Sequence, residues 1–117
     1  MKLIYVAGPF RGPNSWCVER NVRNAEEAAY SLAKLGVIPV CPHTMYRFFD
    51  KTLPDKFWLE ATIQLLKKCD GIFLLENWED SIGAKREKHE ADKLGIKIFN
   101  WDAKYSEIQE WNNTIEK

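Results

Sequence analysis

Short apolar runs alternate along the chain with longer segments in which apolar residues recur every three or four positions. The short runs predict buried strands, and the continuous run GIFLL suits a central parallel strand. The four predicted strands are Leu3–Ala7, Val37–Cys41, Gly71–Leu75 and Ile96–Phe99. Pro39 and Pro42 indicate that the second strand lies near a sheet edge or ends early, because proline cannot donate to a ladder.

The longer segments predict helices, since their apolar positions follow the helical period. The predicted helices run from Ser15 to a stop at Gly36, from Phe57 to Lys68, from Ser81 to a stop at Gly95, and from Tyr105 to Ile115. His43–Pro54 has no clear period and carries aromatic and charged side chains. We expect this segment to be a long loop of the type that covers a ligand site.

Alternating strands and helices predict an α/β fold with a parallel sheet and helices on both faces. The chain of 117 residues is the length of one domain, so we expect a single flavodoxin-like or Rossmann-like domain over residues 1–117, with four to five strands. Ligands of such sheets bind beyond the carboxyl ends of the strands. The loops at that edge are Gly8–Asn14, Cys41–Pro54 and Glu76–Ser81.

Charge and cysteine content limit the kinds of partner and cofactor that we expect. Lys plus Arg and Asp plus Glu both number 17, which is not the basic excess that a nucleic-acid polymer requires. The cysteines Cys17, Cys41 and Cys69 are far apart and lack CxxC spacing, so neither a disulfide framework nor a metal site is expected. We expect a cytoplasmic protein with no cofactor, no signal peptide and no membrane span. His43 and His89 are expected at the surface or in loops.

Glu87 stands out in the helix that begins at Ser81. It shares one helical stripe with Ala84, Ala91 and Leu94, and the remaining positions are mostly charged. A carboxylate that points at a sheet needs a reason, since an unpaired buried charge is costly. The functional interpretation is nucleophilic or acid-base chemistry. The alternatives are a partly exposed ion-paired Glu87, or a shifted helix phase that favours Glu90.

The first strand is followed by the turn GPFRG, whose candidate ligand-binding residues are Gly8, Pro9, Phe10, Arg11 and Gly12. Backbone N–H groups and a guanidinium in such a turn can hold an anion, although an ordinary tight turn explains the glycines equally well. The turn matches neither the dinucleotide fingerprint nor the P-loop.

Two further candidates lie near the third strand. Ser81 suits an ordinary helix cap, and its hydroxyl could also contact a phosphate. Trp58 and Trp78 are expected in the core or in a site wall, and Trp78 is the better candidate for stacking on a base because of its loop position.

Four motifs together resemble one known superfamily. They are Tyr5–Gly8 with the following Pro9–Gly12, the CPHT segment Cys41–Thr44, the pair Cys69 and Asp70 before an apolar strand, and Ser81–Glu87, which contains Gly83. Their order and spacing are similar to those of the nucleoside 2-deoxyribosyltransferase superfamily, including its 2'-deoxynucleoside 5'-monophosphate N-glycosidases. The resemblance covers nearly the whole chain.

The resemblance implies that Glu87 attacks the anomeric carbon of a nucleoside and forms a glycosyl ester, with Tyr5 orienting it. Ser81 corresponds to a serine that binds the 5'-phosphate in the nucleotide hydrolases of that superfamily, whereas the transferases have an acidic residue nearby, which Asp80 could supply. The family's usual leaving-group acid is replaced by Thr62. Asp55 lies two helical turns earlier and could substitute for it.

The leading hypothesis is therefore an N-glycosidase or (deoxy)ribosyltransferase that acts on a nucleoside or nucleoside 5'-monophosphate. The alternative is a non-catalytic nucleotide-binding protein that senses or sequesters a nucleotide-derived signal. A third interpretation, an unrelated regulatory domain, requires a surface-exposed Glu87. The resemblance also implies a homodimer or larger homo-oligomer.

Overall fold

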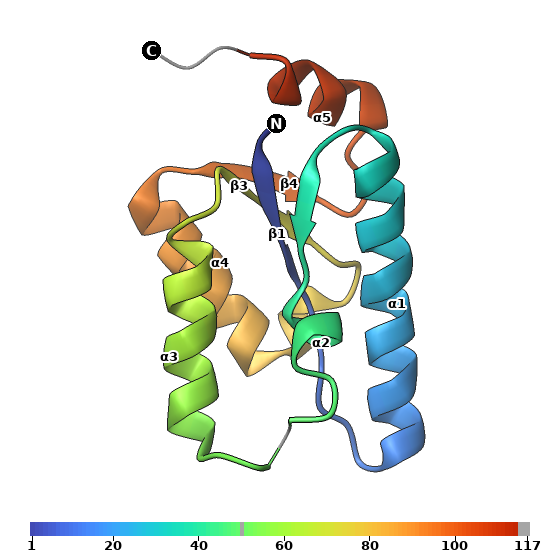
Figure 1. Ribbon diagram of the computed structural model, residues 1–117, viewed down its shortest axis with the longest axis vertical. Coiled ribbons are helices and arrows are strands. Elements are labelled where there is room, and N and C mark those ends of the chain that lie inside the picture. Colours follow the sequence, from blue (N-terminus) through green and yellow to red (C-terminus); the bar gives the residue numbers. More distant parts are fainter. Residues whose placement is uncertain (50, 115–117) are drawn as a thin grey trace.

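The computed structural model describes residues 1–49 and 51–114. Four parallel strands form one sheet in the order β2-β1-β3-β4. The strands are β1 (Leu3–Ala7), β2 (Ile38–Val40), β3 (Gly71–Leu74) and β4 (Lys97–Asn100). The helices are α1 (Ser15–Lys34), α2 (Pro42–Met45), α3 (Asp55–Leu66), the short 3-10 helix η1 (Trp78–Asp80), α4 (Ile82–Leu94) and α5 (Tyr105–Asn112). The predicted α/β fold is confirmed (Figure 1).

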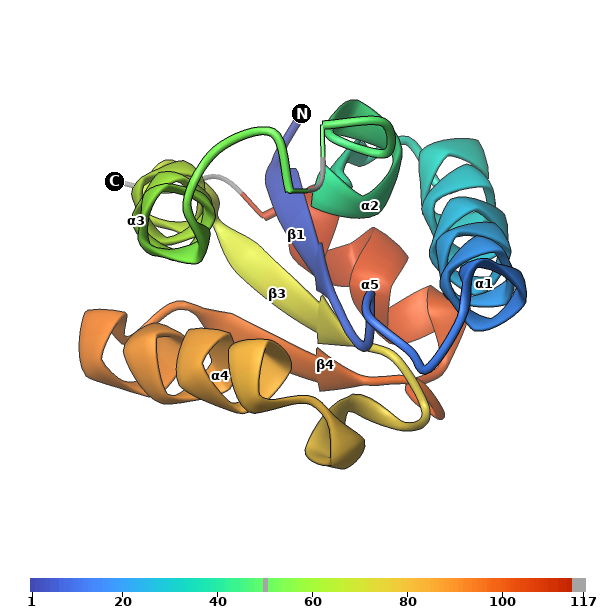
Figure 2. The ribbon, with the colours of Figure 1, turned by 90° about the horizontal axis from the view of Figure 1, so that it is seen from below.

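Helices cover both faces of the sheet. Figure 2 shows α1 and α5 on one side, and α3 and α4 on the other. The alternation of side chains along β1 supplies both cores: Ile4 and Val6 pack in the cluster that includes residues of α1 and α5, while Tyr5 and Ala7 pack in the cluster that includes residues of α3 and α4. An uninterrupted apolar strand is therefore buried on both faces, as expected for a parallel sheet.

The element boundaries differ from the predicted ones in ways that have local causes. β2 lies at the sheet edge, as its prolines indicate, and is shorter than predicted. The helix predicted from Phe57 begins earlier, at Asp55, directly after Pro54. α2 was not predicted, because four residues are too few to show a helical period. The last helix ends at Asn112, and the predicted end at Ile115 lies outside the described residues.

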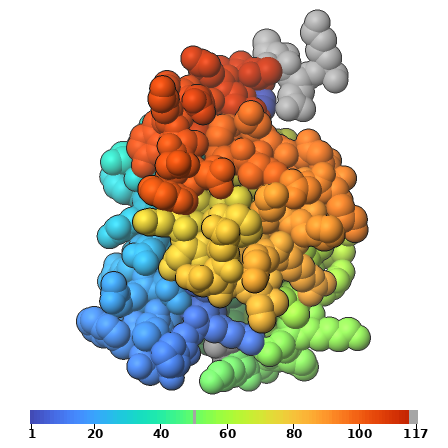
Figure 3. All heavy atoms as spheres, turned by 180° about the vertical axis from the view of Figure 1, so that it is seen from behind, coloured from blue at the N-terminus to red at the C-terminus, as the bar shows by residue number. Residues whose placement is uncertain are grey.

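The carboxyl ends of the strands form the edge at which the site lies. The connection after β1 leads outward to β2, and the connection after β3 leads outward in the opposite direction, to β4. β1 and β3 therefore flank a topological switch point, where ligands of such sheets bind. Figure 3 shows the segment after β1 (blue), the start of α3 (green) and the start of α4 (light orange) meeting at the lower end of the molecule. At the opposite edge, Asp70 accepts a hydrogen bond from the backbone N–H of Leu3 at 2.8 Å.

None of the helices within residues 1–49 and 51–114 is long and apolar enough to cross a membrane.

Candidate active site

A cavity of about 470 Å³ opens at the carboxyl edge of the sheet. Its walls come from the end of β1 and the turn after it, from α2, from the start of α3 and from the start of α4. Nine of the eleven site residues predicted from the sequence line it: Tyr5, Gly8, Pro9, Phe10, Arg11, Asp55, Ser81, Gly83 and Glu87. The volume suits a small-molecule ligand.

Tyr5 and Glu87 form the central polar pair of this cavity. The Tyr5 side chain, on the α4 side of β1, is 1% exposed, and its hydroxyl donates to Glu87 Oε2 at 2.5 Å. The helical stripe that carries Glu87 faces the sheet, since Ala84 and Ala91 are buried. Leu94 was expected on the same apolar stripe, but it is 40% exposed.

Burial governs the titration of both groups. It raises the pKa of Glu87 to about 7, while hydrogen bonds from Tyr5 and Thr62 act in the opposite direction. The pKa of Tyr5 is well above its ordinary value, because the phenol is buried and faces a carboxylate. At neutral pH Tyr5 therefore keeps its proton and donates it in the hydrogen bond, and Glu87 is divided between its two protonation states. The partly buried Glu87 is not the surface-exposed residue that an unrelated regulatory domain would require.

Thr62 lies beside this pair. Its hydroxyl lowers the pKa of both Tyr5 and Glu87, which places it next to both side chains. The same hydroxyl contacts the carbonyl oxygen of Leu59 at 3.2 Å within α3. Thr62, the position at which the sequence resemblance implies an acid, thus faces Tyr5 and Glu87, but it carries a hydroxyl with no readily lost proton.

Arg11 and Asp55 join two walls of the cavity. The Arg11 guanidinium donates to both carboxylate oxygens of Asp55, at 2.6 and 3.0 Å, and so links the turn after β1 to the first residue of α3. Hydrogen bonds from Arg11, and its charge, hold the pKa of Asp55 below its ordinary value. Asp55 is therefore an ionised, exposed carboxylate at neutral pH, and not a protonated acid.

The amino terminus of α4 forms another wall. Ser81 is the helix cap, since its Oγ accepts from the Ala84 backbone N–H at 3.0 Å. Ser81 also lines the cavity, together with Asp80 and Gly83. The capping role and access to a ligand therefore coexist, because a hydroxyl that accepts one hydrogen bond can still donate another.

The glycines of the first turn are explained by packing. A Cβ on Gly8 would lie 2.5 Å from Leu75 Cδ1, so the turn can pass the end of β3 only with glycine there. A Cβ on Gly12 would lie 2.6 Å from Cys17 Cβ in the first turn of α1. Gly12 is not among the residues that line the cavity.

Aromatic side chains form a further part of the cavity wall. Phe10, Tyr46 and Trp58 line the cavity, and the Tyr46 and Trp58 rings lie 5.1 Å apart between centroids. Trp78, the predicted stacking residue, is not in the lining and packs against the buried cluster that includes Ala84. Trp78 follows β3 at the carboxyl edge of the sheet, but its side chain does not reach the cavity.

His43 differs from the sequence-based expectation, because it is buried, with 5% exposure, and lines the cavity. Its Nε2 lies 2.8 Å from the carbonyl oxygen of Pro9, which can only accept, so Nε2 carries the proton. Burial lowers the pKa of His43, and the ring is neutral at pH 7. The position of His43, three residues after an edge strand, was the signal that could have identified it as a site residue. His89 is exposed, as predicted.

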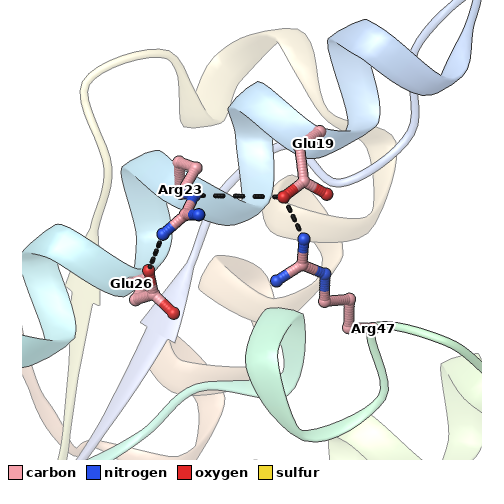
Figure 4. A network of polar contacts seen from close by, with 4 residues as sticks. All are labelled: Glu19, Arg23, Glu26 and Arg47. Carbon is pink, nitrogen blue, oxygen red and sulfur yellow. Dashed lines mark hydrogen bonds and ion pairs between the residues drawn. The ribbon is translucent and has the colours of Figure 1, made fainter.

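An ion-pair network holds the segment that follows α2 against helix α1. Figure 4 shows Arg47 reaching Glu19 of α1, with Arg23 between Glu19 and Glu26 on the same helix. Arg47 follows Tyr46 directly, so the network anchors the segment that carries one wall of the cavity. Within the described residues, no group of three or more His, Cys, Asp or Glu side chains is arranged to hold a metal ion.

Comparisons with known proteins identify the family of this chain. The sequence pattern described as "Domain of unknown function (DUF4406)" matches residues 2–100, which includes every lining residue of the cavity. The chain belongs to the DUF4406 family. The comparison with curated proteins gave no match.

The fold of this DUF4406 chain is similar to that of a solved structure described as a 2-desoxiribosyltransferase from Leishmania mexicana. The TM-score is 0.62 at 19% sequence identity, over 86% of this chain and 63% of that chain. The chain thus spans less than two thirds of the length of that structure. At this level of identity the similarity shows a common fold, the deoxyribosyltransferase fold.

Proposed function

We propose that this protein cleaves the N-glycosidic bond of a nucleoside or nucleoside 5'-monophosphate through a glycosyl-Glu87 intermediate. The observation that carries the proposal is the pairing of Tyr5 with Glu87 inside a cavity at the switch point of the sheet. The deoxyribosyltransferase fold and the superfamily motifs of the sequence support it further.

Tyr5 holds one carboxylate oxygen of Glu87 in place, and the other oxygen serves as the nucleophile. Tyr5 donates to Oε2, so Oε1 attacks the anomeric carbon C1'. As the C1'–O bond forms, the C1'–N bond breaks and its electron pair leaves with the base. Water, or an N–H nitrogen of a second base, then attacks C1', the ester electron pair returns to Glu87, and the proton lost by the attacking group passes to the released base or to solvent. With water as the acceptor the result is hydrolysis, and with a base it is exchange.

The remaining walls suit the other parts of such a substrate. Arg11, the N–H groups at the start of α4, and Ser81 offer positive charge and donors to a 5'-phosphate. Phe10, Tyr46 and Trp58 offer ring faces to a base. In this proposal the sugar lies between the phosphate and the base, beside Tyr5 and Glu87.

Base release from a panel of nucleosides and their 5'-monophosphates tests the proposal. Each compound is incubated with the protein, with and without a free acceptor base, and the products are separated by chromatography. We expect free base or an exchanged nucleoside, and loss of both in Glu87→Gln. Absence of any product across the panel would overturn the proposal.

A second function, nucleotide binding without catalysis, is favoured by one observation. Thr62 occupies the expected acid position, and Asp55 is ion-paired with Arg11. Recovery of an unaltered nucleotide from the purified protein, with no turnover of that nucleotide, would support this function over cleavage.

A further inference from the structure

The cavity holds a nucleophile, but the groups around it are poorly suited to protonate a leaving base. Thr62 has a hydroxyl in place of an acid, and Asp55 is bound by both Nη atoms of Arg11. His43 has a neutral ring whose only proton is donated to the Pro9 carbonyl. Tyr5 directs its proton to Glu87. Among the described residues, the lining has two other side chains that could supply a proton. They are the exposed Asp80 and the phenol of Tyr46 in the aromatic wall.

This arrangement matters because the leaving base is the difficult part of the reaction. An unmodified nucleobase leaves as an anion unless it is protonated as the C1'–N bond breaks. General acid assistance of that kind is typically worth about 10²- to 10⁴-fold in rate. A base that is already positively charged leaves as a neutral molecule and needs no acid.

The charge of the cavity favours a cation. Its described lining contains three carboxyl groups, those of Asp55, Asp80 and Glu87, and one guanidinium, that of Arg11. Asp55 already faces Arg11, which leaves Asp80 and Glu87 as the carboxyl groups in excess. A cationic group on the ligand is attracted by this excess.

The aromatic wall is a second, independent feature that favours a positively charged ligand. Trp58 and Tyr46 line the cavity beside one another, with ring centroids 5.1 Å apart and planes inclined by 46°. The face of an indole or phenol ring attracts a cation placed over it, and tryptophan does so most strongly. A planar, positively charged base would therefore stack on this wall more favourably than a neutral one.

We propose that the substrate of this site is a nucleoside or nucleotide whose leaving base carries a positive charge, such as an N7-alkylated purine or an N-glycosylated pyridinium. The proposal rests on the proposed function and names its substrate class. Glu87 attacks C1', the C1'–N bond breaks, and its electron pair neutralises the charge on the ring nitrogen, so the base departs without a proton. Water then attacks C1', the ester electron pair returns to Glu87, and the water proton passes to solvent.

The test compares matched substrates that differ in the charge of the base. N7-methylguanosine is paired with guanosine, and nicotinamide riboside with its neutral dihydro form, each as the nucleoside and as the 5'-monophosphate. Because cationic nucleosides also hydrolyse faster in water, each kcat/KM is divided by the uncatalysed rate constant. We expect this ratio to be at least about 10-fold higher for the cationic member of each pair.

Two variants of Thr62 separate the absence of an acid from other causes. Thr62→Asp restores a carboxyl group at that position, and Thr62→Asn has a similar shape without one. We expect Thr62→Asp to cleave guanosine about 10²-fold faster than Thr62→Asn does, the lower end of the range for general acid catalysis. The two variants should cleave N7-methylguanosine at equal rates. Circular dichroism and thermal melting confirm that both are folded.

The outcomes distinguish this inference from the proposed function. Equal or larger normalised rates for the neutral members would overturn the inference and leave the proposed glycosidase intact. Equal acceleration of both substrates by Thr62→Asp would overturn the role assigned to the missing acid. Release of base from neither member of any pair would overturn the proposed function and this inference together.

Discussion

Replacing Glu87 by glutamine removes a carboxyl group that is costly to ionise inside the cavity. Its pKa is about 7 in the folded protein, against an ordinary value of 4.5, because burial disfavours the charged form. Below pH 4.5 the carboxyl is protonated in both the folded and the unfolded chain. As pH rises from 4.5 to 7, the unfolded chain releases this proton first, so the free energy of unfolding falls.

The size of the effect follows from the two pKa values. At about 1.4 kcal/mol per pH unit, the interval from 4.5 to about 7 corresponds to about 3 kcal/mol, which is reached above pH 7. Glutamine has a similar shape, keeps an oxygen that accepts from Tyr5, and does not titrate. We therefore expect Glu87→Gln to be about 3 kcal/mol more stable than the natural protein at pH 8.5, and nearly equal to it at pH 4.5, while it loses base release.

Urea unfolding of both proteins at several pH values between 4.5 and 9 measures this difference. Glu27→Gln is the matched control, since Glu27 is exposed on α1. The control should follow the natural protein at every pH. If the free energies of unfolding of Glu87→Gln and the natural protein run parallel across this range, the carboxyl is not held in a costly environment and the reasoning is wrong.

Three further predictions concern the same cavity. Tyr5→Phe removes a hydrogen bond that lowers the pKa of Glu87. The rise of kcat/KM with pH, expected near pH 7 in the natural protein, should therefore move to higher pH. An unchanged midpoint would contradict the role of Tyr5. Arg11→Gln should raise KM for 5'-monophosphates by about tenfold or more and leave nucleosides unaffected, because a charge-assisted hydrogen bond is lost; equal effects on both would remove Arg11 from the phosphate site. Ser81→Ala should lower the free energy of unfolding by about 1 kcal/mol through the lost helix cap, and a melting temperature equal to that of the natural protein would contradict the cap.

The periodic parts of the sequence predicted most of what positions the site. The strand period places Tyr5 on one face of β1, and the helical period places Glu87 on the stripe with Ala84 and Ala91. Each prediction concerned a single residue. Their contact joins positions 82 residues apart, and it depends on how α4 lies across the sheet. Periodicity alone does not contain that information.

The failures arose where no period exists. Residues 42–54 contain a four-residue helix and the buried His43, yet the segment shows neither helical nor strand spacing. The choice of Trp78 over Trp58 relied on loop position, but Trp78 packs against the buried cluster on the α4 side of the sheet, while Trp58 lines the cavity from α3. The ion pair between Arg11 and Asp55 was also not foreseen, although both residues were candidates.

The most direct test of the central claim is detection of the glycosyl ester on Glu87. A nucleoside 5'-monophosphate with fluorine at C2' slows the hydrolysis of such an ester, because fluorine destabilises the oxocarbenium-like transition state. A cationic leaving base keeps the first step fast. After incubation, mass spectrometry of the intact protein and its peptides should show one added sugar phosphate, located on Glu87 and absent from Glu87→Gln. Release of base with no adduct on Glu87, or with an adduct on another residue, would contradict the account.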